Sequence, residues 1–203
     1  MKNNIGILMI LALMVLCAGC YGKGDSAEKV IFTGKGKILN LAVSCNGEHI
    51  LFIESMDKNI DLHMIDKTGK TIWSRENTDK DCYAREIAIS SDGQYAAWNL
   101  VKPIEETGGE NVISKTYLFS PIGDLLWERS AEGEIRISKN GQYILVGKQI
   151  YSTQLVKLFS RDGNELATFP RSEISMSDDG SKLLIDGVLY ENEAGKPKEI
   201  LSG

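Results

Sequence analysis

The chain has 203 residues, a formal net charge of −5 at pH 7 and four cysteines. A mildly acidic chain without a cluster of lysine or arginine does not have the composition of a nucleic-acid-binding protein, so we expect no nucleic-acid partner. The length suits one domain that buries a sizeable core.

The N-terminus has the pattern of a secretory signal peptide. One positive charge, Lys2, precedes an apolar run over residues 5–16, which is short for a transmembrane helix. The small residues Ala18-Gly19 follow, directly before Cys20. We therefore predict that this segment is removed and takes no part in the fold.

This segment resembles a bacterial lipoprotein signal, in which the first mature residue is a lipidated cysteine. The resemblance implies removal of residues 1–19, lipidation of Cys20 with acyl chains such as palmitate, and a flexible tether over residues 20–29. It implies a membrane-anchored protein of the cell envelope that faces the periplasm or the exterior. Cys17 stands where the family usually has leucine, with Leu16 one place earlier. The alternatives are an ordinary signal peptide or an uncleaved anchor.

The remaining residues, 30–203, are predicted to form a single domain in which one phrase occurs four times. The phrase is a hydrophobic run, then Ser-x-(Asn/Asp)-Gly, then a second hydrophobic run, and its copies fall at 44–47, 90–93, 138–141 and 177–180. The glycines at 47, 93, 141 and 180 are thus 46, 48 and 39 residues apart. Repeats of this length built from short strands are typical of β-propeller blades.

Each copy predicts four short strands and two tight turns. Runs rich in Ile, Val, Leu, Tyr and Phe are typical of strands, and Asn or Asp before glycine supplies the left-handed residue of a hairpin. No helical period follows the signal. The predicted strands are 38–43, 49–54, 60–65 and 71–75; 85–89, 95–100, 116–119 and 125–128; 135–137, 143–147, 155–159 and 165–169; 174–176, 182–185, 188–190 and 199–201.

Two sets of apolar residues are predicted to pack between neighbouring blades. One set stands one and three positions before each repeated serine, where strand alternation puts both side chains on one face. The other is Trp73 and Trp127, at matching places in the last strands of the first two copies. The first set comprises Leu41, Val43, Ile87, Ile89, Ile135, Ile137, Ile174 and Met176.

Residues 37–203 resemble the WD40-like and TolB-type propeller repeats of secreted bacterial and archaeal proteins, which carry a similar Ser-x-Asp-Gly hairpin between their first and second strands. The resemblance implies an all-β fold, a β-propeller of four short four-stranded antiparallel blades. The WD dipeptide is absent, and four blades are fewer than is common in the family. Three arrangements stay open: a small ring that residues 29–33 close, an open or partial propeller, and two chains that complete a larger ring as a homodimer.

The end of the propeller opposite the glycine hairpins is predicted to carry the longer loops, where binding functions are common. These loops are acidic, and we hypothesise a surface there for a cation or a cationic partner. The alternative is a solvated loop face that keeps the protein soluble. The residues concerned are Asp57, Asp79, Asp81, Glu105, Glu106 and Glu110.

A candidate metal site follows from the alignment of the four copies. Four residues before each repeated serine stand Asn40, Glu86, Glu134 and Glu173. In a closed propeller these side chains would ring the central axis, and carboxylate and amide oxygens suit Ca²⁺. The alternative is that Arg85 and Arg136, nearby in the sequence, neutralise them.

Nucleophilic catalysis has little support in the sequence. There are two histidines and no Gly-x-Ser-x-Gly elbow. The repeated Ser and Asn or Asp residues are turn formers. We therefore expect no enzyme and no resident cofactor, but a non-enzymatic binding or scaffolding lipoprotein whose partner is an envelope protein, a peptide or a glycan. The alternatives are a metal-dependent hydrolase or lyase that uses the axial carboxylates, and an accessory fragment of a larger propeller system.

Overall fold

The computed structural model describes residues 30–57, 59–78, 81–104, 112–147, 155–170 and 173–201. The chain divides into two compact units, Met1–Thr33 and Gly34–Gly203. Residues 30–33 of the first unit belong to no helix or strand. Among the described residues, no helix is long and apolar enough to cross a membrane. Cys20 and the tether over 20–29 lie outside the described residues.

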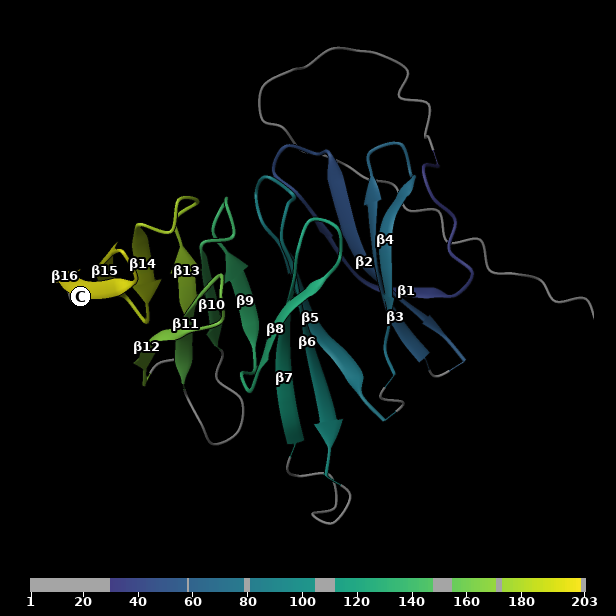
Figure 1. The fold of residues 1–203 in the computed structure, drawn as a ribbon. Coiled ribbons are helices and arrows are strands. Elements are labelled where there is room, and N and C mark those ends of the chain that lie inside the picture. The colour runs from purple at the N-terminus through teal and green to yellow at the C-terminus, as the bar shows by residue number, and fades with distance from the viewer. Residues whose placement is uncertain are drawn as a thin grey trace, which may run out of the picture. The chain divides into compact units, whose positions relative to one another are not determined.

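The second unit contains four antiparallel sheets of four strands each, which follow one another along the chain (Figure 1). In every sheet the strands pair in sequence order, as expected for strands joined by short turns. The strands are β1 (Lys37–Val43), β2 (His49–Met56), β3 (Asn59–Asp66) and β4 (Thr71–Glu76); β5 (Tyr83–Ile89), β6 (Ala96–Pro103), β7 (Val112–Phe119) and β8 (Leu125–Arg129); β9 (Glu134–Ile137), β10 (Tyr143–Gly147), β11 (Val156–Ser160) and β12 (Glu165–Phe169); β13 (Ile174–Met176), β14 (Lys182–Ile185), β15 (Val188–Glu193) and β16 (Lys196–Leu201).

All sixteen predicted strands occur, in the predicted order, so the all-β propeller-type architecture is confirmed. The main errors are at strand ends. β16 begins at Lys196 rather than at 199, and β15 continues to Glu193. The polar segment 196–199 lacks a strand pattern in the sequence, but its backbone pairs with residues 190–193 of β15. Pairing between strands, rather than local propensity, decides these ends.

Neighbouring sheets contact each other through their first strands. β1 contacts β5, β5 contacts β9 and β9 contacts β13, as expected when the first strand of each blade is the innermost. Each sheet also has a register irregularity between its third and fourth strands, at Met64/Ile65, Leu118/Phe119, Leu158/Phe159 and Leu189/Tyr190. The sequence repeat is therefore also a structural repeat, in which each copy forms the same kind of four-stranded sheet.

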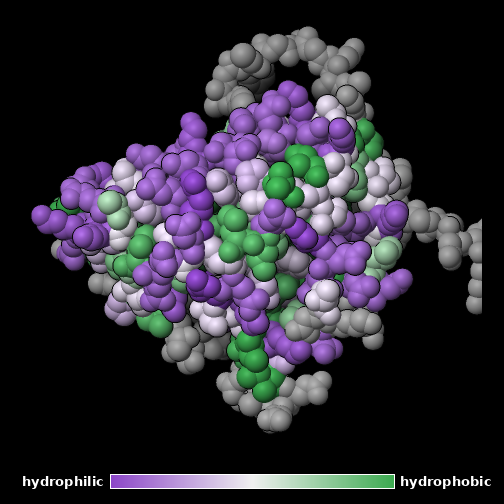
Figure 2. Space-filling model, in the orientation of Figure 1, coloured by the Kyte–Doolittle hydropathy of each residue, from purple (hydrophilic) through white to green (hydrophobic). Residues whose placement is uncertain are grey.

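Three separate hydrophobic clusters fill the spaces between consecutive sheets. One aromatic pair spans each space, with ring centroids 5.8, 5.5 and 5.0 Å apart: Trp73 with Phe119, Trp127 with Phe159, and Phe169 with Tyr190. Figure 2 shows that the hydrophobic residues on the visible face form separate groups among hydrophilic ones. Apolar burial between the sheets is thus the main stabilising contribution to the stack.

The predicted packing of the two tryptophans is confirmed, and so is that of the apolar pairs in the second, third and fourth sheets. The exception is the first pair, because Leu41 and Val43 are half-buried and belong to none of the three clusters. In the second, third and fourth sheets the pair faces the preceding sheet. Among the described residues, no sheet precedes the first one.

Closure of a small ring by residues 29–33 is one of the three arrangements that the sequence leaves open. The fourth sheet consists of its own four strands, β13–β16, and the described residues 30–33 form no strand. Lys29 lies outside the described residues. Among the described strands, no contact between β1 and β13 matches those that join the other first strands.

The turn glycines also shape the packing between sheets. An aromatic ring at the start of a second strand lies over the first-turn glycine of the next sheet, where an added Cβ would fall within 2.1–2.6 Å of the ring. The pairs are His49 with Gly93, Tyr95 with Gly141, and Tyr143 with Gly180. Glycine at these positions therefore serves both the left-handed turn and the close approach of a ring.

Candidate functional site

The four Ser-x-(Asn/Asp)-Gly segments form the same hydrogen-bonded turn. Each glycine has a positive φ of 66–75°, and its N–H donates to the serine carbonyl at 2.8–2.9 Å. The serine hydroxyl accepts the N–H of the residue two positions after the glycine, at 2.9–3.0 Å. The predicted role of these residues as turn formers is confirmed, because their polar atoms are engaged in the turn itself.

The variable second residues of these turns connect different sheets. The Cys45 thiol donates to the Ser91 hydroxyl at 3.5 Å, and that hydroxyl donates to a carboxylate oxygen of Asp178. The Lys139 N–H donates to the Asp178 carbonyl at 2.6 Å. Sequence reasoning did not predict these contacts. The second position is the one at which the four turns differ most, and this variation could have marked its residues as having a role outside the turn. Their polar atoms bond one another, so this end ties all four sheets together.

The four predicted metal ligands lie on or beside the first strands of the four sheets. The side-chain amide oxygen Oδ1 of Asn40 accepts the N–H of Leu41 at 2.7 Å, and Glu134 forms an ion pair with Arg136. The Glu173 N–H donates to the Asp186 carboxylate at 2.6 Å. Within the described part of the chain, no three of His, Cys, Asp or Glu are grouped as a metal site. The calcium site stays a prediction, and the alternative pairing with arginine occurs at Glu134.

Little of the predicted acidic binding face can be placed. Asp57 and Asp81 are exposed, and Asp57 has a positive φ of 49° at the turn between β2 and β3. The other predicted residues of this face, Asp79, Glu105, Glu106 and Glu110, lie outside the described residues. The acidic loop face therefore stays a prediction.

The structure points instead to the outward face of the fourth sheet, the face turned away from the third sheet. Its central row crosses the four strands through Ser175, Leu184, Leu189 and Leu201. The residues that match Leu184 in the other sheets, four positions after the turn glycine, are Leu51, Ala97 and Leu145. Each of those is 0% exposed, whereas Leu184 is 46% exposed.

Leu201, at the end of this row, is likewise more exposed than its counterparts in the other sheets. Leu201 is paired with Leu189 as Trp73 is with Met64 and Trp127 with Leu118. The two tryptophans are 7% and 5% exposed, whereas Leu201 is 64% exposed. A row that packs against the next sheet in the first two copies is thus open to solvent in the fourth.

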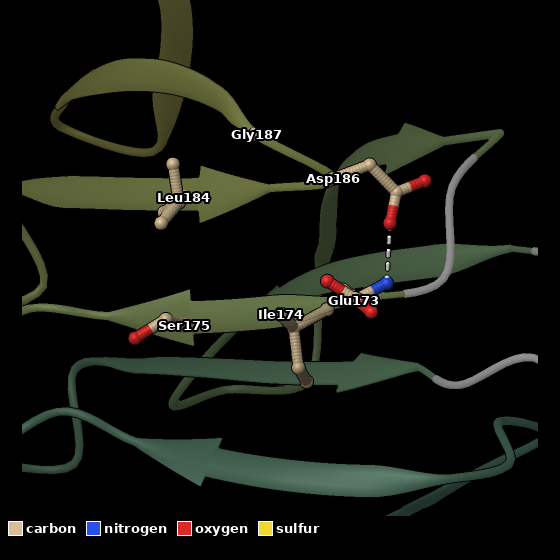
Figure 3. Close-up of a pocket in the computed structure, with 6 residues that line it drawn as sticks. All are labelled: Glu173, Ile174, Ser175, Leu184, Asp186 and Gly187. Atoms are coloured by element: carbon tan, nitrogen blue, oxygen red, sulfur yellow. Dashed lines mark hydrogen bonds between the residues drawn. The ribbon is translucent and has the colours of Figure 1, made fainter. Parts of the chain in front are cut away.

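A shallow hollow of about 110 Å³ lies at one corner of this face (Figure 3). Ser175 and Leu184 line it, and the carboxylates of Glu173 and Asp186 stand at its edge. Asp186 and Gly187, with φ of 46° and 78°, form the two-residue turn between β14 and β15.

A charged row borders the leucine row on its other side. Lys182, Glu191 and Lys198 face one another across β14, β15 and β16. Lys182 forms an ion pair with Glu191, and its hydrogen bond, followed by its charge and that of Lys198, lowers the pKa of Glu191. The outward face thus has carboxylates on one side of an apolar row and an excess of positive charge on the other.

No family model and no curated protein matches the chain. Solved structures do resemble it. Hydrazine synthase of Kuenenia stuttgartiensis has a TM-score of 0.51 at 14% identity, over 80% of this chain and 58% of that one. A 6-phosphogluconolactonase-like protein from Bacteroides uniformis has a TM-score of 0.51 at 15% identity, over 81% and 55%.

The β-propeller domain of Cps50 (Swd1) from Myceliophteria thermophila has a TM-score of 0.50 at 15% identity, over 78% of this chain and 49% of that one. The chain thus spans about half the length of these structures. At such identities the likeness shows the fold alone. Together with the four meander sheets, it defines the class: an all-β protein built from β-propeller blades.

Proposed function

We propose that this chain is a non-enzymatic binding or scaffolding propeller, held at a membrane of the cell envelope by a lipid on Cys20. Its docking surface is the outward face of the fourth sheet, and its partner is a protein. The observation that carries the proposal is the exposure of Leu184, 46% against 0% for its three counterparts. An apolar row left open in this way, beside charged residues, is typical of a protein interaction surface.

Two further features support this proposal. The repeated Ser and Asn or Asp side chains are engaged in holding turns, which is a structural rather than a catalytic use. The lipid anchor is supported by the resemblance of the segment ending in Ala18-Gly19-Cys20 to a lipoprotein signal. A tether of about ten residues would let the domain turn its open sheet face toward a neighbour.

The lipid anchor can be tested by expressing the full chain in bacteria fed with an alkyne analogue of palmitate. We expect the wild-type protein to be labelled and to sediment with membranes. Cys20→Ser should lose the label and leave the membrane fraction, whereas Cys45→Ser should behave as wild type. Labelling that persists in Cys20→Ser would contradict the anchor.

The docking surface can be tested with a photo-crosslinking amino acid placed at position 184 of the full chain in intact cells. The matched control carries the same amino acid at Ile122, which is 73% exposed in a turn of the second sheet. We expect a discrete protein adduct from position 184 that Leu201→Glu abolishes, and no such adduct from position 122. The absence of an adduct at 184, or equal adducts from both positions, would refute this role of the face.

A further inference from the structure

We infer that the protein docked on the outward face of the fourth sheet is a second copy of this chain, related to the first by a two-fold axis along the leucine row. The inference rests on the proposed function of this face. It adds the identity of the partner and the symmetry of the contact.

The residue pattern along β14 carries the inference. Lys182 and Leu184 lie on the same face of the strand, and Asp186 borders the same hollow as Leu184. Lys182 stands two positions before Leu184, about 7 Å along the strand. Asp186 stands two positions after it, in the turn that follows β14, and its carboxylate accepts the Glu173 N–H. A two-fold contact needs a self-complementary surface: if one residue of the first copy contacts a second residue of the other copy, the reverse contact also forms.

A two-fold axis along the leucine row meets this requirement. It reverses the direction of β14 and lays the strand over its own copy, so Leu184 faces Leu184. Lys182 of each copy then faces Asp186 of the other, and the contact occurs twice. Such charge complementarity fixes the register of two surfaces and disfavours other partners.

The same face is poorly suited to a head-to-tail contact with a further blade. Where the other sheets present His49, Tyr95 and Tyr143 to the turn glycine of the next sheet, the fourth sheet presents Lys182. A charged side chain in an ion pair cannot replace a ring packed on glycine. The apolar row is retained, but the residues specific to the contact between sheets are not.

The first sheet likewise offers little open apolar surface for a head-to-tail ring. Of its residues that point away from the second sheet and correspond to inter-sheet residues elsewhere, Leu41 and Val43 are half-buried. The others are Ile50, Phe52 and Ile65. All three are already buried in this structure. The exposed leucine row of the fourth sheet therefore finds its best complement in another copy of itself.

The decisive experiment is thiol crosslinking of the full lipidated chain in membranes. Leu184→Cys is introduced together with Cys45→Ser and Cys82→Ser, and a short bis-maleimide is added, because facing sheets lie about 10 Å apart, which is beyond the reach of a disulfide. We expect a covalent dimer from Leu184→Cys, because the two-fold axis brings the two positions together, and none from Ile122→Cys in the same background. A dimer from both variants, or from neither, would overturn the inference.

Charge variants in the Leu184→Cys background test the register. Lys182→Glu places two carboxylates opposite each other twice per dimer, and we expect about tenfold less trapped dimer. Glu191→Gln removes the same ion pair within one chain but keeps Lys182, so it should trap as well as the parent. Equal trapping in Lys182→Glu and Glu191→Gln, with both folded by circular dichroism, would also overturn the inference.

The crosslinker at position 184 separates this inference from the proposed function. An adduct with twice the mass of the chain supports both. An adduct with a different protein overturns the second copy but leaves the docking surface standing. No adduct overturns both.

Discussion

Substitution of two turn glycines separates the contribution of the turn from that of the packing between sheets. Gly47 and Gly141 occupy the same position of the repeated turn, with φ of 70° and 66°. A Cβ at Gly47 would have no neighbour within 4 Å, whereas a Cβ at Gly141 would lie 2.3 Å from Cδ2 of Tyr95 in the preceding sheet. Alanine therefore imposes the same backbone strain at both positions, but it collides with a neighbouring side chain only at position 141.

The magnitudes follow from these two terms. A left-handed alanine costs about 1–2 kcal/mol, partly offset by about 0.4–1 kcal/mol of reduced entropy in the unfolded chain. We expect Gly47→Ala to lower the free energy of unfolding by about 1 kcal/mol. Gly141→Ala should lose about 1–3 kcal/mol more, because the collision with Tyr95 overpacks the contact.

Urea unfolding followed by tryptophan fluorescence measures both values. A third variant tests the cause: Tyr95→Ala should cost less in the Gly141→Ala background than in the wild type, by about 1–2 kcal/mol. Equal losses for the two glycine variants would refute the idea that the ring contact between sheets matters for stability. So would full additivity of Tyr95→Ala with Gly141→Ala.

Three further outcomes are expected. The pKa of Asp179 is lowered to about 2, first by the hydrogen bond from the Ser177 hydroxyl, so its contribution to stability is complete above its ordinary value of 3.8 and is lost as the pH falls toward 2. Asp179→Asn should therefore flatten the acid side of a plot of Tm against pH, and an unchanged slope would contradict this. Phe159→Ala empties a buried inter-sheet site and should cost about 3–5 kcal/mol in urea unfolding, against about 0.5 kcal/mol for exposed Leu126→Ala. Asn99→Ala removes a buried amide that donates to the chain leading into the third sheet, and a loss of about 1–3 kcal/mol is expected in thermal unfolding, with no change in Tm counting against it.

The repeat made the fold predictable because its signals are local. A left-handed glycine after Asn or Asp, as at Gly93, closes a hairpin wherever it occurs, and alternating apolar residues mark each strand beside it. The beginning of β16 was missed because its polar residues form a strand only by pairing with β15. The ties among Cys45, Ser91 and Asp178 were also beyond prediction, because they join turns that are far apart in the sequence.

Sequence by itself determined the number of sheets, the order of the strands and most of the residues that pack between sheets. It could not distinguish Leu184 from Leu51, since both are leucines four positions after a turn glycine in a strand of the same pattern. Only the tertiary structure shows that the second sheet buries Leu51, whereas Leu184 of the fourth sheet is exposed. The reason is physical: a strand pattern specifies which face is apolar, but whether that face is buried depends on what packs against it.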